Sequence, residues 1–187
     1  MHYHGQENMI RKCTHRDLSV MYEIINDAAQ AYKGVIPDDR WHEPYMPIDE
    51  LKHEIDDGVE FWGYEEAGSL VGVMGFQDKG EVYLIRHAYV RKSSQSRGIG
   101  RELLRYLEKM TDKPILVGTW ADATWAIQFY QKNDYRLLSR QETEQLLKKY
   151  WKIPDRQVAT SVVLANQRWG SGQEEVGRKR TPTAIPI

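Results

Sequence analysis

The spacing of apolar residues changes along this chain, and each spacing predicts a different kind of element. Near the start, a short apolar run over 9–13 predicts a strand. Apolar residues then recur every three or four positions, which predicts a helix beginning after Thr14-x-x-Asp17, a capping-box pattern. Gly34 and Pro37 end this helix. A second helix is predicted over 48–57, with Gly58 closing it.

Strand patterns dominate the middle of the chain. Runs over 59–65, 70–77 and 82–90 are separated by turn residues and predict an antiparallel meander. A helix over 98–110 follows, with Met110 among its inward positions. The rest predicts strands over 115–119, 135–138 and 157–164 and helices over 124–132 and 141–150. This order mixes hairpins and crossovers, so the expected fold class is α/β (α+β mixed), a mixed sheet flanked by helices.

Length, composition and charge limit the class of protein to which this fold can belong. The 187 residues suit one domain, expected over 9–166, between a flexible N-terminus (1–8) and a disordered tail (167–187). A net charge of −1 gives no bias toward nucleic acid or membrane, and no apolar run approaches the roughly 20 residues that cross a bilayer. Cys13 is the single cysteine, and the six histidines lack metal-ligand spacing. We expect a cytoplasmic protein without a metal.

The chemistry is most concentrated in the loop from Gln95 to Gly100, between a predicted strand and a predicted helix. Glycines there leave backbone N–H groups open at a helix N-terminus, which suits a phosphate or pyrophosphate. The loop lacks the Gly-Lys-Ser/Thr ending of ATPase loops and the third glycine of dinucleotide-binding loops. A plain strand-to-helix turn is the structural alternative.

Two motifs resemble those of one family. Gln95-x-x-Gly98-x-Gly100, preceded by Ala88-Tyr89-Val90, resembles motif A of the GCN5-related N-acetyltransferase (GNAT) superfamily. The segment 126–135 (AIQFYQKNDY) resembles its motif B, and the likeness extends from about Met9 to Leu164. The resemblance implies a mostly antiparallel sheet with one splayed parallel strand pair. It also implies acetyl-CoA as cosubstrate and transfer of the acetyl group to a primary amine by direct attack in a ternary complex.

The resemblance assigns residues to the cosubstrate. The strand end would pair with the pantetheine arm and the loop would wrap the pyrophosphate. The residues expected to bind acetyl-CoA are Ala88, Tyr89, Val90, Gln95, Ser96, Arg97, Gly98, Ile99, Gly100 and Arg101.

Acetyl transfer needs a proton acceptor and a proton donor, because a lysine-type amine has a pKa of roughly 10.4 and the thiolate leaves more easily when protonated. By resemblance Tyr130 is the donor. Glu81 and His87 are the alternative acceptors. Strand alternation places both on one face, together with Tyr83, Ile85 and Tyr89, and would bring them to a common site.

The acceptor is expected to contact the loop over 32–46. We single out Tyr32, Trp41, Glu43 and Tyr45, because aromatic and acidic groups suit a cationic amine. A proline-bounded loop that only caps the core is the alternative. The acceptor itself stays open among small amines, amino acids and protein amines, as does assembly into a homodimer.

Two positions depart from motif B. Ala123 stands where the family often has Asn, and Asp134-Tyr135 replaces Gly-Phe. These departures keep a second hypothesis in view, a non-catalytic acyl-CoA-binding sensor or interaction domain. A nucleic-acid binder using Arg97, Arg101 and Arg105 is disfavoured by the near-neutral charge.

Overall fold

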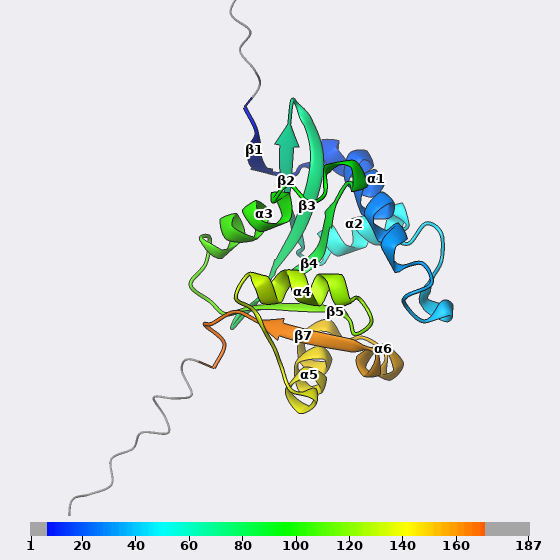
Figure 1. The fold of residues 1–187 in the computed structure, drawn as a ribbon, viewed down its shortest axis with the longest axis vertical. Helices are drawn as coiled ribbons and strands as arrows, with labels where there is room; N and C mark the ends of the chain where they lie inside the picture. Colours follow the sequence, from blue (N-terminus) through cyan, green and yellow to red (C-terminus); the bar gives the residue numbers. More distant parts are fainter. Residues whose placement is uncertain (1–6, 171–187) are drawn as a thin grey trace, which may run out of the picture.

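A seven-stranded mixed sheet forms the centre of the protein, in the order β1-β2-β3-β4-β5-β7-β6 (Figure 1). The computed structural model describes residues 7–170. The strands are β1 (Met9–Lys12), β2 (Glu60–Glu66), β3 (Ser69–Asp78), β4 (Tyr83–Val90), β5 (Ile115–Trp120), β6 (Arg136–Leu137) and β7 (Ser161–Ala165). The helices are α1 (Leu18–Ala29), α2 (Ile48–Asp56), α3 (Ile99–Glu108), α4 (Thr124–Lys132), α5 (Arg140–Leu146) and α6 (Asp155–Ala159).

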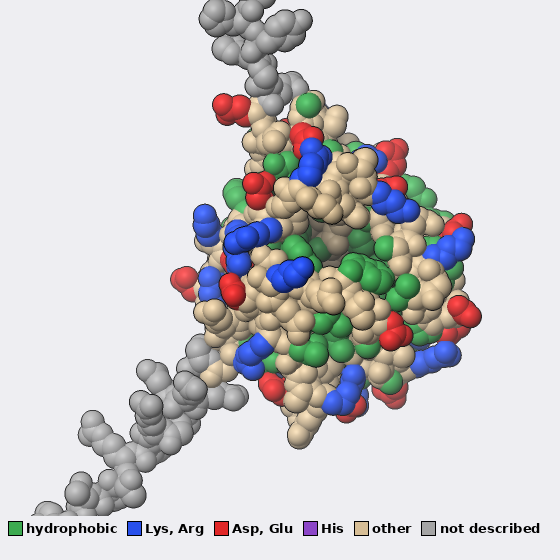
Figure 2. Space-filling view, viewed as in Figure 1, with side chains coloured by type: hydrophobic (Ala, Val, Ile, Leu, Met, Phe, Trp, Pro, Cys, Tyr) green, Lys and Arg blue, Asp and Glu red, His purple; other side chains and the backbone are tan. Residues whose placement is uncertain are grey.

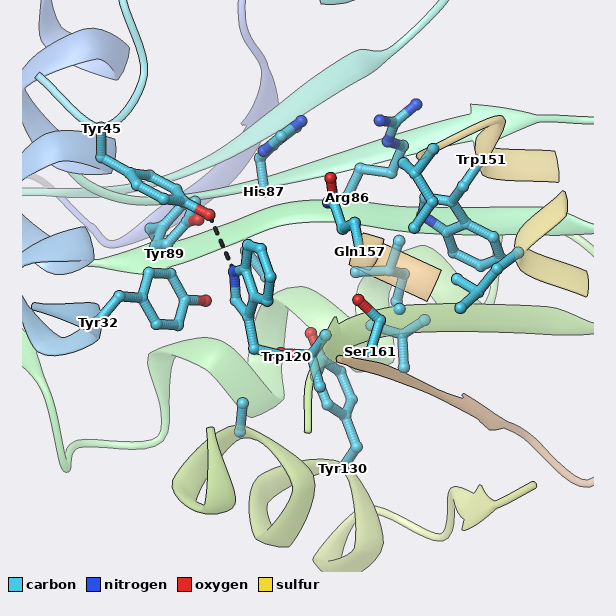
Figure 3. A pocket seen from close by; sticks show the side chains of 18 residues that line it. Tyr32, Tyr45, Arg86, His87, Tyr89, Trp120, Tyr130, Trp151, Gln157 and Ser161 are labelled. Carbon is cyan, nitrogen blue, oxygen red and sulfur yellow. Dashed lines mark hydrogen bonds between the residues drawn. The ribbon is translucent and has the colours of Figure 1, made fainter. Parts of the chain in front are cut away.

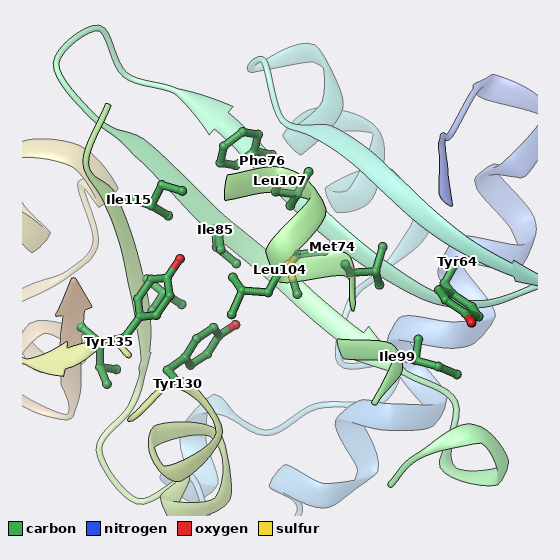
Figure 4. Close-up of a cluster of buried hydrophobic side chains, with 13 residues drawn as sticks. Tyr64, Met74, Phe76, Ile85, Ile99, Leu104, Leu107, Ile115, Tyr130 and Tyr135 are labelled. Atoms are coloured by element: carbon green, nitrogen blue, oxygen red, sulfur yellow. The ribbon is translucent and has the colours of Figure 1, made fainter. Parts of the chain in front are cut away.

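Helices cover both faces of the sheet. On one face, α3 buries Leu103, Leu104 and Leu107 completely against the sheet, beside Tyr130 of α4 (Figure 4). On the other face, α1 packs its buried residues around Val73 of β3, and α5 packs around Leu84 of β4. The helix-period stripes seen in the sequence are therefore the faces that meet the sheet.

The parallel pair is the unusual part of the sheet. β4 pairs in parallel with β5 only from Tyr83 to Ile85, opposite Ile115 to Val117. All other neighbouring strands are antiparallel. Beyond Ile85 the two strands diverge, so the predicted mixed sheet with a splayed parallel pair is confirmed.

The segment between β6 and β7 differs from the prediction. The helix expected over 141–150 ends as α5 at Leu146 and continues as a π-helical turn, η5 (Leu147–Trp151). The first half of the strand expected over 157–164 is wrong, because Pro154 and Asp155 begin α6 there, and β7 starts at Ser161. Met110 is 45% exposed, because α3 ends at Glu108, before its stripe reaches that position.

The folded part also extends past the expected boundary at 166. The Trp169 indole N–H donates to Glu142 of α5 at 3.2 Å, and Arg168 donates to the Glu108 carbonyl at 3.0 Å. Residues 167–170 thus belong to the packed domain rather than to a tail. The expectations for residues 1–6 and 171–187 lie outside the described residues. Among residues 7–170, no helix is both long and apolar enough for a bilayer crossing.

The capping box formed by Thr14 and Asp17, at the 3-10 turn η1 (His15–Asp17) before α1, generates a pH-dependent prediction. Arg11 donates to both oxygens of Asp17 at 2.9 Å, and these bonds lower the pKa of Asp17 to about 2. Because this pKa lies below its unfolded value of roughly 3.9, the stabilisation is full above that pH and is lost as the pH falls toward 2. We expect Asp17→Asn to lower the free energy of unfolding by about 1–2 kcal/mol near neutral pH.

Urea unfolding at a series of pH values checks this expectation. The difference between Asp17→Asn and the parent should shrink between about pH 4 and pH 2. Asp56→Asn at an exposed position is the control and should give no such convergence. A difference that stays constant down to about pH 2 would contradict the assignment.

Candidate active site

The divergence of β4 from β5 leaves backbone groups of β4 facing a gap. The Arg91 N–H donates to the Val71 carbonyl of β3 at 2.8 Å. Because successive residues of a strand direct their backbone groups to opposite sides, those of Val90 and Ala88 face away from β3, toward the gap. The Val90 carbonyl accepts from the Gln95 side chain at 3.0 Å. Of the three predicted strand-end residues, Tyr89 instead directs its backbone toward β3.

The loop that follows β4 leads into an open helix N-terminus. Gly98 is the N-cap of α3, with φ 82°, and no side chain caps the helix there. Ser96 also has a positive φ, 65°. The first N–H groups of α3, at Ile99, Gly100 and Arg101, therefore point outward at the positive end of the helix dipole. Two positive-φ residues close together before uncapped N–H groups form a concave site suited to an anion.

The two arginines of the loop differ in their partners. Arg97 forms an ion pair with Glu66 of β2 at 3.0 Å. Arg101 is exposed on the first turn of α3.

The start of the loop is attached to α1. The backbone N–H of Lys92 donates to the Asp27 carboxylate of α1 at 3.0 Å. The loop is thus held at both sides while its centre stays open.

A cavity of about 420 Å³ extends from this loop into the protein. It runs between α1, α3 and α4, and five of the predicted binding residues line it: Ala88, Tyr89, Val90, Gln95 and Gly100. A Cβ at Gly100 would lie 3.3 Å from the Phe129 ring of α4, so glycine lets the two helices approach here. Figure 2 shows a hollow between α3 and α1, with basic side chains on the α3 side.

A second cavity, of about 170 Å³, lies on the other side of the gap (Figure 3). It is lined by residues of β4, β5, α6 and the η5 turn, together with Tyr45 from the loop before α2. The two cavities share five lining residues: Tyr32, Ala88, Tyr89, Ala126 and Tyr130. A chain entering through the larger cavity would therefore meet a molecule in the smaller one at these residues.

Tyr130 lies between the two cavities with its hydroxyl protonated. It extends from α4 and is only 4% exposed. Burial raises the pKa of Tyr130 above its usual value, with a smaller contribution from Tyr32. Within residues 7–170 no hydrogen bond engages its hydroxyl, so the proton is available to a molecule in either cavity.

A β-bulge determines where His87 points. The pairing of β3 with β4 shifts register between Val73 and Gly75, and His87 adopts a positive φ of 56°. The bulge reverses the alternation, so the prediction that Ile85, His87 and Tyr89 share a face is wrong. Ile85 packs with α3, whereas Tyr89 packs with α1. Because a bulge adds one residue, every later side chain changes face.

His87 lines the smaller cavity and contacts a buried carboxylate. Its Nε2 lies 3.3 Å from Glu54 Oε2 of α2, and Arg86 lies 3.4 Å from the same oxygen. Burial acts to raise the pKa of Glu54, but His87 and Arg86 outweigh it and hold that pKa below its usual value. Glu54 is thus an anion beneath the cavity wall. Nothing in the sequence pattern marked it.

Glu81, the other candidate acceptor, lies elsewhere. It precedes β4 at the end remote from the gap and lines neither cavity. Its carboxylate accepts from Lys149 at 3.2 Å and from the Tyr150 hydroxyl at 3.1 Å, and the Lys149 bond is the larger cause of its lowered pKa. The structure brings His87, and not Glu81, to the site.

Of the predicted acceptor residues, Tyr32 and Tyr45 line the smaller cavity. Trp41 does not; it stacks on Tyr45 with ring centroids 5.8 Å apart. Glu43 is exposed and pairs with Lys33 at 3.3 Å. Trp151, Gln157 and Ser161 also line the smaller cavity, and sequence reasoning singled out neither Gln157 nor Ser161 because it placed both in one strand.

The departures from motif B fit the structure locally. Asp134 has a positive φ of 70°, the conformation that glycine would adopt there. Tyr135 is buried in the core, and its hydroxyl donates to Glu108 at 3.1 Å. Ala123 is fully buried and packs with Ile36 and Trp120. These substitutions leave both cavities in place.

A family model described as "Acetyltransferase (GNAT) domain" matches residues 23–148, more than half of the chain. The chain belongs to the GNAT acetyltransferase family. The resemblance found in the two motifs is therefore confirmed. No curated protein sequence matches the chain significantly. Within the described residues, no cluster of three or more His, Cys, Asp or Glu side chains suits a metal ion.

Solved structures share the GNAT fold. PaiA N-acetyltransferase from Thermoplasma acidophilum, in complex with coenzyme A, is similar with a TM-score of 0.65 and 17% identity, over 86% of this chain and 99% of that one. The ribosomal-protein-S18-alanine N-acetyltransferase of Escherichia coli gives 0.58 and 17%, over 86% and 93%. A putative acetyltransferase from Salmonella typhimurium, with its cofactor acetyl-CoA, gives 0.53 and 20%, over 71% and 81%.

The bulge in this GNAT domain depends on Gly75. A Cβ there would overlap the Arg86 carbonyl and press on the Val59 side chain. We expect Gly75→Ala to lower the free energy of unfolding by about 3 kcal/mol, because backbone atoms must move. Gly80→Ala is the control: a Cβ there meets open space and only the positive φ is strained, which costs about 1 kcal/mol. Urea unfolding of both variants checks this, and equal losses would contradict it.

Proposed function

We propose that this protein is an N-acetyltransferase that transfers the acetyl group of acetyl-CoA to a primary amine. The observation that carries the proposal is the meeting of two cavities at Tyr130, where β4 and β5 diverge. One cavity begins at an anion site and suits the cosubstrate, and the other suits an acceptor. Both molecules would be present together, which favours direct attack in a ternary complex.

The residues of the larger cavity fit acetyl-CoA. The uncapped N–H groups of α3, with Gly98 and Ser96 before them, would hold the pyrophosphate, and exposed Arg101 would add charge. The backbone groups of Ala88 and the N–H of Val90 would pair with the amides of the pantetheine arm, as when a peptide adds to a sheet edge. No side chain caps the N-terminus of α3, so no capping hydrogen bond has to be displaced there.

The smaller cavity supplies the proton chemistry. His87 would accept the proton of the amine, directly or through a water molecule, with Glu54 holding the ring in place. An N–H of the splayed strand, at Val90 or Ala88, would stabilise the oxyanion. Tyr130, which keeps its proton because burial raises its pKa, would donate a hydrogen bond to the departing thiolate, and a thiolate leaves more easily beside such a donor. The proton lost by the amine and the proton gained by the thiol balance.

Calorimetric titration with acetyl-CoA, with ATP and NAD as controls, tests the cosubstrate assignment. Saturable micromolar binding of acetyl-CoA alone is expected. Thiol release is then followed across a panel of amines. Tight binding without thiol release for any amine would contradict the enzyme assignment and favour a non-catalytic acyl-CoA-binding domain. Absence of binding by folded protein would contradict both.

Tyr130→Phe tests the proton donor. Phe keeps the ring in the core, so folding and acetyl-CoA affinity should change little. Without the proton, we expect kcat to fall about 100-fold. Steady-state thiol release and calorimetry measure the two quantities. An unchanged kcat, with chemistry shown to be rate-limiting, would remove Tyr130 from the mechanism.

His87→Gln and Glu81→Gln form a matched pair, because His87 lies in β4 at the smaller cavity and Glu81 lies before β4 at its remote end. We expect His87→Gln to lower kcat/KM about 100-fold, because it removes the proton acceptor at the cavity. Glu81→Gln should stay within about two-fold of the parent, because its contacts are exposed ion pairs. The same thiol-release measurement decides between them. A larger loss for Glu81→Gln would reverse the assignment.

A further inference from the structure

The smaller cavity contains no acidic side chain, contrary to the expectation from the loop over 32–46. None of the residues that line it is Asp or Glu. Glu43 pairs with Lys33, and Asp39 pairs with Arg156 at 2.8 Å, so these acids are engaged on the surface. An acceptor with a second ammonium group would therefore find no carboxylate to pair it, and burying that charge unpaired is costly.

Arg86, the positively charged side chain that lines the cavity, already has partners. Arg86 lies 3.4 Å from Glu54, and it donates to the Gln77 side chain at 3.2 Å. Gln77 is buried and in turn donates to the Asp57 carbonyl of the α2 C-cap at 2.8 Å. A carboxylate on the acceptor would have to break this network to reach Arg86. The acceptor's reacting amine aside, an additional positive or negative charge on the acceptor would thus find no free charged partner in the cavity.

What the cavity offers instead is aromatic surface. Tyr32, Tyr45 and Trp120 form one wall, fixed by the bond from the Trp120 indole N–H to the Tyr45 hydroxyl at 3.1 Å. Trp151 of the η5 turn stands across from them (Figure 3). Gln157 and Ser161 lie between these walls and provide neutral polar groups.

The width between the walls is set by one close contact. A Cβ at Gly118 of β5 would lie 3.0–3.3 Å from three atoms of the Trp151 indole. Glycine therefore lets the indole lie directly on the strand, and the cavity keeps a volume of about 170 Å³. This volume is similar to that of an engineered apolar cavity of about 150 Å³ that binds one benzene, so it suits an amine with one ring.

We propose that the acceptor is a compact monoamine with a flat apolar body, of the arylalkylamine class, and that Trp151 on Gly118 determines how wide that body can be. The inference rests on the proposed function and names the substrate class of the same site. The aromatic walls would stabilise the entering ammonium by cation–π contact until His87 takes its proton. Diamines, polyamines and amino acids would be poor acceptors, because their additional charges meet no partner.

The first test compares kcat/KM for phenethylamine, spermidine, lysine and a peptide with an N-terminal alanine. We expect phenethylamine to exceed each of the others by at least about 10-fold. A preference for spermidine, lysine or the peptide would overturn the inference while leaving the acetyltransferase in place. If the protein acetylates none of these four compounds and no wider amine either, the proposed function is overturned, and this inference with it.

The second test uses one variant that widens the smaller cavity and one that narrows it. Trp151→Ala should raise kcat/KM for 2-(1-naphthyl)ethylamine relative to phenethylamine by about 10-fold or more. Gly118→Ala should lower the same ratio, because its Cβ pushes the indole into the cavity. Trp169→Ala, at a tryptophan that lines neither cavity, is the matched control and should leave the ratio unchanged.

Acetyl-CoA affinity provides an internal check on folding, because neither Trp151 nor Gly118 lines the larger cavity. Trp151→Phe is measured as a milder variant and should shift the ratio in the same direction as Trp151→Ala. Equal ratios in Trp151→Phe, Gly118→Ala and the parent, with acetyl-CoA affinity retained, would overturn the role of this contact.

Discussion

The early end of the β4–β5 pairing is the constraint on which the site depends. Two parallel strands that stay together would satisfy each other's backbone groups and leave no space between them. Here the pairing covers three residue pairs and then stops. Beyond Ile85 the Gln95 side chain satisfies the Val90 carbonyl, and the other N–H and C=O groups that face the gap need water or a ligand as their partner. A molecule rich in amide groups, such as the pantetheine arm, matches that need, and the gap is where the two cavities meet.

A second constraint follows from the bulge beside the gap. Because Gly75 has no side chain, the Arg86 carbonyl can lie close to it. The extra residue of the bulge then moves the later side chains of β4 to the opposite face of the sheet. Without the bulge, His87 would lie on the face of Ile85, among the apolar side chains under α3. With it, His87 reaches Glu54, and Arg86 joins Gln77 and Glu54 in a buried network. The ion pairs of Glu54 with His87 and Arg86, and the hydrogen bonds of Gln77, join α2, β3 and β4 to one another.

The sequence was sufficient for the fold class and for locating the open loop before α3. Helix stripes, turn residues and capping signals are local, and so is the loop from Gln95 to Gly100, so each could be recognised within a short window. The face to which each β4 side chain points could not be recognised in this way. It depends on the bulge, and the bulge depends on Gly75 of the neighbouring strand β3. Glu81 looked as suitable as His87 in the sequence. Its position at the far end of the strand, beside Lys149, appears only in three dimensions.

The smaller cavity, which we propose for the acceptor, was the least predictable part, for a physical reason. Its walls come from segments far apart in the chain: Tyr45 before α2, Trp120 at the end of β5 and Trp151 in a π-helical turn. A π-helical turn adds a residue to the helical repeat, and so it redirects the side chains after it, here Trp151. Acids near one another in sequence, such as Asp39 and Glu43, turned outward to basic residues instead of inward. Residue types in a loop therefore say little about an acceptor until the partners of each charge are known, whereas uncapped backbone at a helix N-terminus can be inferred directly.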